Sequence, residues 1–190
     1  MRPLRPHRLR AALAVASLLL LAAPPPAGAA TLGQRVLARG DHGGDVSTLQ
    51  RVLAMKSYRV GAADGIFGRH TKAAVTRFQR RAGLAVDGRV GPQTTGALAW
   101  GWNVQQASFF GPGLYGNRTA CGQVLTPRTR GIAHRSLPCG TAVPVYHDGL
   151  IAIFRVIDRG PYVSGVSIDL TYAAARRVGV SSTTAVRATH

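Results

Sequence analysis

The sequence contains no glutamate, and its seven acidic residues are all aspartates. Any chemistry that needs a carboxylate is therefore restricted to seven positions. Against these acids stand 24 lysines and arginines, which give a formal net charge of +17. A charge of this size favours a polyanionic partner.

Long apolar runs are also scarce. One spans residues 11–23, follows four arginines and precedes a stretch rich in proline and alanine. A basic start, a short apolar core and small residues at the end predict a secretory signal peptide at residues 1–29, cleaved after Ala29. The core is shorter than the roughly 20 residues that cross a bilayer, and no cysteine follows the cleavage site to carry a lipid.

We therefore expect a secreted, extracellular protein that is associated with the cell wall and has no membrane contact after cleavage. Export separates the protein from nucleic acid, so anionic cell-wall polymers become the better polyanionic partners. No motif implies a metal or an organic cofactor, and we expect a monomer.

Only two cysteines are present, Cys121 and Cys139. In an exported protein an even pair predicts a disulfide. A zinc site with His134 and a pair of free thiols are the alternatives, although the spacing fits no zinc motif.

The first half of the chain predicts helices. Residues 45–55 and 71–78 carry apolar side chains at helical spacing, and a third short helix starts at Pro92. The turn Asp64-Gly-Ile-Phe-Gly68 recurs 23 residues later as Asp87-Gly-Arg-Val-Gly91. This repeat indicates an internal duplication of a turn–helix unit.

The two turns, with Gln50 and Gln79 ahead of them, resemble the small three-helix peptidoglycan-binding domain of wall-lytic enzymes over residues 40–100. The resemblance implies binding of wall glycopeptide, not catalysis. Within such a domain we expect Asp64 and Asp87 to brace their turns by hydrogen bonds.

From residue 107 onward, short β-rich runs alternate with turns. The run at 150–157 leads into Asp158, and a helix is predicted at 171–178. Many short strands with one helix indicate a compact barrel. The last residues, 181–190, lack periodicity, and we expect a disordered tail there.

Four blocks, at residues 107–122, 133–141, 158–162 and 168–170, resemble the double-psi β-barrel domain of the rare lipoprotein A family. The resemblance covers residues 107–180. It implies a six-stranded barrel with one short helix, behind a small all-α domain. It also implies lytic transglycosylation of peptidoglycan, in which the 6-hydroxyl of N-acetylmuramic acid (MurNAc) attacks its own anomeric carbon. A non-catalytic, expansin-like wall-binding or loosening protein is the alternative, and a plain hydrolase ranks third.

Cleavage of a glycosidic bond needs an acid that protonates the departing oxygen. The barrel has three carboxylates. Asp148 lies in a predicted hairpin turn, and Asp169 precedes a helix that it would cap or brace, so both are interpreted as structural. Asp158, at the end of a strand, is left as the catalytic acid. Burial would help it keep its proton, whereas the neighbouring arginines favour its charged form.

The resemblance supplies further candidates. His134 matches the family's functional histidine and is expected to donate to a sugar or to Asp158, or else to brace the barrel. Gln123 stands where the family often has a glutamate. An amide can bind substrate but cannot carry catalytic charge, which keeps the non-catalytic alternative open.

Three more side chains are predicted to bind substrate. Tyr115 and Tyr162 could stack on sugar faces, and Arg135 could meet a wall carboxylate. Buried edge aromatics and a solvated arginine are the alternatives.

Overall fold

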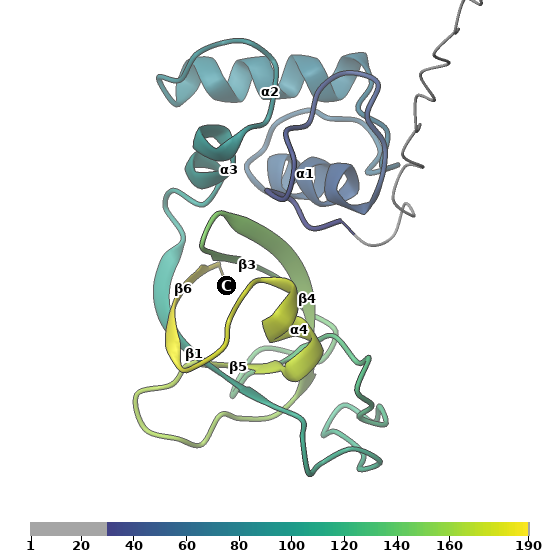
Figure 1. The fold of residues 1–190 in the computed structure, drawn as a ribbon, viewed down its shortest axis with the longest axis vertical. Coiled ribbons are helices and arrows are strands. Elements are labelled where there is room, and N and C mark those ends of the chain that lie inside the picture. Colours follow the sequence, from purple (N-terminus) through teal and green to yellow (C-terminus); the bar gives the residue numbers. More distant parts are fainter. Residues whose placement is uncertain (1–29, 190) are drawn as a thin grey trace, which may run out of the picture.

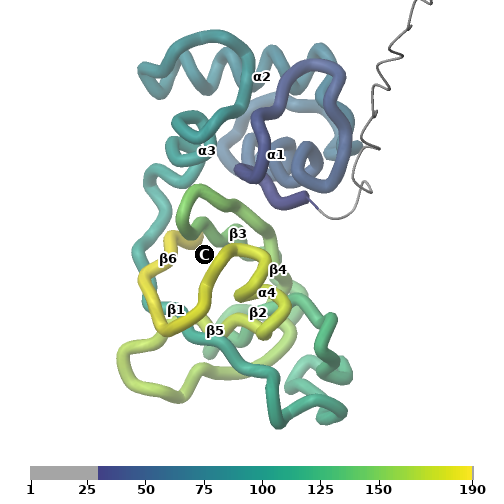
Figure 2. The backbone as a smooth tube through the Cα atoms, viewed as in Figure 1, coloured from purple at the N-terminus to yellow at the C-terminus, as the bar shows by residue number. Residues whose placement is uncertain are grey.

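The computed structural model describes residues 30–189, which form a helical domain stacked on a β-barrel (Figure 1, Figure 2). The predicted signal peptide, residues 1–29, lies outside this described part. Between residues 30 and 189 no helix is long and apolar enough to cross a bilayer. The predicted fold class, a small three-helix domain followed by a six-stranded barrel with one short helix, is confirmed.

The helical domain consists of α1 (Gly44–Met55), α2 (Arg69–Arg81) and α3 (Pro92–Leu98). Pro92 occupies the first turn of α3, where its missing N–H is not needed for a helical hydrogen bond. Apolar side chains spaced for one helical face pack inward together. The core includes Val46, Leu49, Leu53, Phe67, Val75 and Leu98.

The duplicated turn is held by a duplicated set of hydrogen bonds. In the first copy, the buried Gln50 amide donates to the Asp64 carboxylate at 2.8 Å and to the Thr71 hydroxyl at 3.1 Å. The Gln50 oxygen accepts the backbone N–H of Gly65 at 2.9 Å, and Asp64 accepts that of Ile66 at 2.9 Å. The bonds from Gln50 and Ile66 lower the pKa of the Asp64 carboxyl.

The second copy repeats this arrangement. Gln79 donates to Asp87 at 2.8 Å and to the Thr94 hydroxyl at 3.2 Å, and its oxygen accepts the backbone N–H of Gly88 at 2.9 Å. The pKa of Asp87 is lowered by the backbone bond from Arg89 and by Gln79. The predicted bracing role of both aspartates is therefore confirmed.

The barrel is closed by six short strands. They are β1 (Asn103–Phe110), β2 (Ile132–Ala133), β3 (Ala142–His147), β4 (Leu150–Asp158), β5 (Ile168–Thr171) and β6 (Thr184–Ala188). Around the barrel the order is β1-β5-β2-β4-β3-β6. Strands β1 and β5, and strands β2 and β4, pair in parallel, and the other neighbours are antiparallel. The short helix α4 (Tyr172–Arg177) follows β5.

Alternation along the strands separates an apolar interior from an outer face. Ala107, Ile168 and Leu170 belong to the barrel core. Because successive strand side chains point to opposite faces, Ser108 and Asp169, which lie next to these core residues, face outward. The outer face therefore receives Ser108 of β1 and Asp169 of β5, whereas Gln105 of β1 is buried.

The predicted disordered tail at residues 181–190 is wrong for residues 184–188, which form a strand, while His190 lies outside the described residues. Strand β6 pairs with β1 from Thr184 to Ala188 and with β3 at Arg187 and Ala188, and so closes the barrel. Val186 and Ala188 are buried while Arg187 is exposed. This alternation is too short to recognise without the two strands that it pairs with. The barrel accordingly extends from Asn103 to Ala188, beyond the predicted bounds of 107–180.

The segment before α1 joins the two domains. The backbone of Leu32 pairs with Ile151 of β4, and that of Leu37 pairs with Val90 of the helical domain. The Leu32 and Leu37 side chains are fully buried. Residues 32–37 therefore contact both domains.

Candidate active site

Four strands bring together side chains that are far apart in the sequence. Ser108 on β1 lies opposite Asp169 on β5, and Asp169 lies opposite Ala133 on β2. Ala133 in turn lies opposite Asp158 on β4. Because directly opposed residues lie side by side on one face of a sheet, these four residues form a continuous row. We call it the carboxylate row; its two aspartates flank Ala133 and are two strand spacings, or about 10 Å, apart at Cα.

A β-bulge sets the position of Asp158 in this row. Ile132 is paired with Val156, whereas the next residue of β2, Ala133, is paired with Asp158. Strand β4 thus advances two residues while β2 advances one. A bulge of this kind re-aims side chains. Val156 lies in the barrel core, and Asp158 lies beside Ala133 in the row.

Asp169 is a half-buried carboxyl with a perturbed proton affinity. Burial raises the pKa of Asp169, the hydrogen bond from Ser108 lowers it, and the charge of Asp158 raises it. The net direction is upward. The Ser108 hydroxyl donates to Asp169 at 2.8 Å. Asp169 therefore holds a proton to higher pH than a solvated aspartate does.

The expectation that Asp169 caps the following helix is wrong. The N-cap of α4 is Thr171, whose hydroxyl oxygen accepts the backbone N–H of Ala174 at 3.3 Å. Asp169 lies two residues earlier, inside β5, so its carboxylate faces the row and not the helix end. Its hydrogen bond with Ser108, which links β1 to β5, is the structural role that remains for Asp169.

Asp158 stands at the end of β4 among hydrogen-bond donors. Its Oδ1 accepts the backbone N–H groups of Ala120 and Arg159, both at 2.8 Å. Its backbone carbonyl accepts the N–H of His134 at 3.2 Å. N–H dipoles that converge on one oxygen form a site suited to negative charge.

His134 directly follows Ala133 and is only 8% exposed. Its Nδ1 accepts the backbone N–H groups of Leu137 at 3.1 Å and Ser136 at 3.3 Å. This pattern assigns the ring proton of the neutral imidazole to Nε2. The histidine thus braces its own loop, and it also lines an open pocket of about 360 Å³ together with Gln105.

The predicted disulfide between Cys121 and Cys139 is confirmed, with a Cα–Cα distance of 5.7 Å. Because both sulfurs are bonded to each other, the zinc and free-thiol alternatives are excluded. The bond joins the loop that offers the Ala120 N–H to Asp158 to the loop that follows His134. It therefore connects two chain segments that border the carboxylate row.

Two arginines hold loops beside the site. Arg135 donates to the backbone carbonyls of Pro161 at 2.6 Å and Val166 at 3.0 Å. Arg159 donates to the carbonyl of Leu137 at 2.9 Å. The guanidinium of Arg135, predicted to meet a wall carboxylate, is thus engaged by the loop between β4 and β5.

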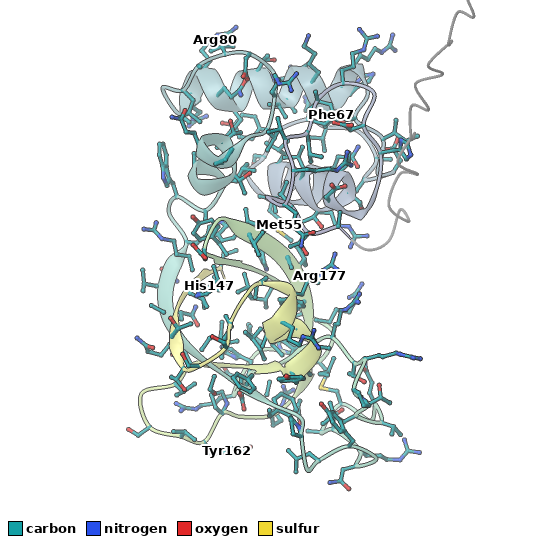
Figure 3. The ribbon with its side chains drawn as sticks, in the orientation of Figure 1. Met55, Phe67, Arg80, His147, Tyr162 and Arg177 are labelled. Atoms are coloured by element: carbon teal, nitrogen blue, oxygen red, sulfur yellow. A yellow bond between two sulfur atoms is a disulfide. The ribbon has the colours of Figure 1, made fainter. Side chains whose placement is uncertain are left out.

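The other predicted substrate-binding residues lie on loops. Tyr162 is 84% exposed, on a loop at the end of the barrel that points away from the helical domain (Figure 3). Gln123 is exposed, on the loop between β1 and β2. Tyr115 lines a second pocket, separate from the one that contains His134. Tyr115 and His134 therefore do not share a pocket.

Sequence reasoning missed Ser108. The available signal was the alternation from Ala107 to Phe109, which predicts that the serine faces away from the core. Its partner, Asp169, lies 61 residues away, so only the pairing of β1 with β5 shows the contact.

A three-helix domain with duplicated turns, followed by a closed barrel whose carboxylate row lies next to a histidine, defines a modular class of double-psi β-barrel proteins. Comparison with known families agrees. Residues 42–98 match the model of a putative peptidoglycan binding domain, and residues 105–189 match the model of the lytic transglycolase domain. The chain therefore combines a match to a putative peptidoglycan binding domain with a barrel that matches the lytic transglycolase domain and resembles that of the rare lipoprotein A family.

Curated relatives are named endolytic peptidoglycan transglycosylase RlpA, some with the qualifier probable. The protein of Synechocystis sp. is 44% identical over 40% of this chain and 24% of its own length. Those of Aquifex aeolicus and Yersinia pestis are 42% and 41% identical, over 39% and 43% of this chain and 34% and 23% of their own lengths. The chain thus matches only a quarter to a third of these relatives.

Two of the solved structures that resemble the chain each cover less than half of it. The SleB N-terminal domain is 41% identical over 34% of this chain and 88% of its own, with a TM-score of 0.33. An expansin of Clavibacter michiganensis is 20% identical over 45% of this chain and 48% of its own, with a TM-score of 0.37.

Proposed function

We propose that the protein is a secreted lytic transglycosylase that cuts the bond from MurNAc to N-acetylglucosamine and leaves a 1,6-anhydro-MurNAc end. The observation that carries this proposal is the carboxylate row, in which Asp169 has a raised pKa near the charge of Asp158. Glycan cleavage needs a group that delivers a proton to the leaving oxygen, and a nucleophile that loses one. The lytic transglycolase match of the barrel supports the same reaction.

In the proposed reaction Asp169 donates its proton to the glycosidic oxygen as the bond to C1 of MurNAc breaks. The 6-hydroxyl oxygen of the same sugar forms the new bond to C1, and Asp158 accepts the hydroxyl proton. No water is consumed, and proton exchange with solvent restores both carboxyls. Asp158 thus keeps the catalytic role predicted from the sequence, but as the proton acceptor. Asp169 replaces it as the acid because burial favours its protonated form.

His134 is proposed to orient the substrate. With its proton on Nε2, the imidazole can donate a hydrogen bond to a sugar oxygen in the pocket that it lines. Gln123 and Tyr162, both exposed on neighbouring loops, are proposed to contact the glycan strand.

Peptidoglycan is the partner that the binding domain of the family implies. We propose that this domain tethers the barrel to the wall and that the positive charge adds attraction to anionic wall polymers. Such attraction is weakened by salt. The proposed enzyme acts as a monomer outside the cytoplasm.

Mass spectrometry of the fragments released from purified glycan strands tests the reaction. We expect 1,6-anhydro ends, whereas reducing ends would indicate a hydrolase and contradict the proposal. Asp158→Asn and Asp169→Asn should each slow release by about 10²–10⁴-fold, the usual contribution of general acid–base groups. Asp148→Asn is the matched control, because Asp148 has φ 43° in the β3–β4 turn, a conformation that asparagine tolerates.

One observation favours a second candidate, an expansin-like wall protein without catalysis. The exposed Gln123 offers an amide where the family often has a carboxylate. If neither the native protein nor Gln123→Glu releases fragments from several wall substrates, this second function stands and the first fails.

A further inference from the structure

A second, larger pocket lies apart from His134. It has a volume of about 550 Å³ and is lined by residues of the segment before α1, of the loop between β1 and β2, and of α4. None of its lining residues is acidic. Its aromatic and basic lining residues are Tyr115, Arg128, Arg130, Tyr172, Arg176 and Arg177. We call it the arginine pocket.

Two of these arginines are close enough to repel each other. Burial lowers the pKa of Arg177, and the charge of Arg130 lowers it further, while Asp45 acts in the opposite direction. Asp45 is already paired with Arg35 at 2.7 Å. The Arg177 guanidinium is held by the carbonyl of Ala30 at 2.9 Å, so its position on α4 is fixed (Figure 3). An anion in the pocket would offset this repulsion.

Two tyrosines, Tyr115 and Tyr172, form another part of the pocket wall. Arg176 lies over the ring of Tyr172 at 5.9 Å. A side chain at Gly111 would come within 3.1 Å of the Tyr115 hydroxyl and of Tyr172, and the φ of Gly111 is +149°. Glycine at this position therefore allows both tyrosines to approach the end of β1, where the Tyr115 hydroxyl can supply a further hydrogen bond.

The arginine pocket lies further along the two strands that carry Ser108 and Asp169. Strand β1 runs parallel to β5, with Phe110 opposite Thr171, and Tyr172 follows at once. Asp169 and Tyr172 are three positions apart along the chain, which corresponds to about 10 Å in an extended strand. A polymer bound at the carboxylate row could therefore place a side group in the pocket.

We propose that the arginine pocket binds an oxyanion, a phosphate or carboxylate group carried by the wall polymer on which the barrel acts. Planar guanidinium groups pair with such oxyanions through two parallel hydrogen bonds. Four arginines without an acidic neighbour in the lining favour an anion over a neutral sugar. The inference that the anion comes from the wall rests on the proposed function. The inference that the pocket binds an oxyanion does not depend on it.

Inorganic phosphate is the first probe, titrated against the full chain while the arginine side-chain Nε–H signals are followed by NMR. Saturable shifts are expected in the native protein. Arg130→Gln with Arg176→Gln, both exposed side chains, should weaken binding about tenfold or more as charge-assisted bonds are lost. Arg80→Gln with Arg187→Gln changes the net charge equally at exposed positions outside the pocket and should leave binding unchanged.

Equal weakening by the two double variants would mean unspecific charge attraction and would overturn the site. Because this titration involves no glycan cleavage, its result is independent of the proposed reaction.

Retention on purified sacculi then identifies the source. We expect the Arg130→Gln/Arg176→Gln variant to be retained less well than the Arg80→Gln/Arg187→Gln control. Loss of that difference after removal of phosphodiester polymers assigns the anion to phosphate, and loss after removal of stem peptides assigns it to carboxylate. A difference that survives both treatments would overturn the wall as the source.

Discussion

The Ser108 hydroxyl on β1 lies 2.8 Å from the Asp169 carboxylate on β5, and this bond opposes the burial that raises the pKa of Asp169. A donor to a carboxylate stabilises its charged form. Ser108 therefore limits the pH range over which Asp169 remains protonated. This relationship makes the assignment of the acid testable without removal of either carboxylate.

Ser108→Ala should shift the alkaline limb of the pH–rate profile to higher pH. The hydrogen bond lowers the pKa of Asp169, so its loss raises that pKa and extends the pH range in which the acid is protonated. Initial rates of anhydro-product release between pH 4 and 8 measure the shift. Ser108→Thr keeps the hydroxyl and should restore the native profile; a shift toward lower pH in Ser108→Ala would contradict the role of Asp169.

Asp169→Asn should change the pH dependence of stability. In the unfolded chain the carboxyl titrates near its ordinary value, while in the fold its pKa is raised mainly by burial. The stability that goes with the protonated carboxyl is fully present below the unfolded pKa and is lost as pH rises through the folded pKa. Relative to Asp169→Asn, the native protein should therefore lose free energy of unfolding as pH rises from the ordinary aspartate pKa through the raised pKa of the fold.

Urea unfolding of both proteins at several pH values measures this difference. Asp64→Asn provides an internal contrast, because the pKa of Asp64 is lowered by Gln50 and Ile66. The stability from Asp64 is present above the unfolded pKa and lost as pH falls through the folded pKa. The same pH trend for both variants would refute the assignment of opposite shifts.

Gln50→Ala and Gln79→Ala should destabilise the helical domain by similar amounts. Each truncation leaves a backbone N–H and a bracing aspartate without the glutamine, in turns where that glutamine is 1% exposed. The expected loss is about 2–3 kcal/mol for each, the cost of buried polar groups left unsatisfied. Urea unfolding followed by helical circular dichroism measures it.

The exposed Gln93 on α3 supplies the control for those truncations. Gln93→Ala should change the free energy of unfolding by less than about 0.5 kcal/mol, as surface substitutions usually do. If Gln50→Ala lowers the free energy of unfolding no more than Gln93→Ala does, the duplicated hydrogen bonds of the two turns do not stabilise the domain.

Removal of the Cys121–Cys139 disulfide should destabilise the barrel. The bond closes a loop with a sequence separation of 18, which corresponds to about 3 kcal/mol in the chain-entropy model. Cys121→Ser with Cys139→Ser should show this loss in urea unfolding. A reducing agent should lower the stability of the native protein toward that of the double variant and leave the variant unchanged; an effect on both would point to another cause.

Several features were predictable from the sequence because their causes are local. The apolar run at 150–157 became β4, which ends at Asp158 as the following Gly160-Pro161 turn predicts. Export and an even cysteine count predicted the disulfide. The repeated turns at Asp64 and Asp87 needed only their own spacing to be recognised as equivalent.

The tail shows where sequence reasoning failed, and Arg135 shows contacts that it did not indicate. A five-residue strand such as β6 becomes stable only through its ladder with β1 and β3, and that ladder depends on residues some 40 to 80 positions away. Arg135 is exposed, and its guanidinium donates to backbone carbonyls of the loop at 160–166. Neither partner can be inferred from neighbouring residues.

The sequence by itself determined the order of the two domains, the strand that ends in Asp158, and the restriction of carboxylate chemistry in the barrel to three aspartates. Only the tertiary structure decided how Asp158 and Asp169 differ. The pKa of Asp169 depends on burial and on a charge and a hydroxyl carried by other strands. These influences act through space, and the closure of the barrel brings their sources together.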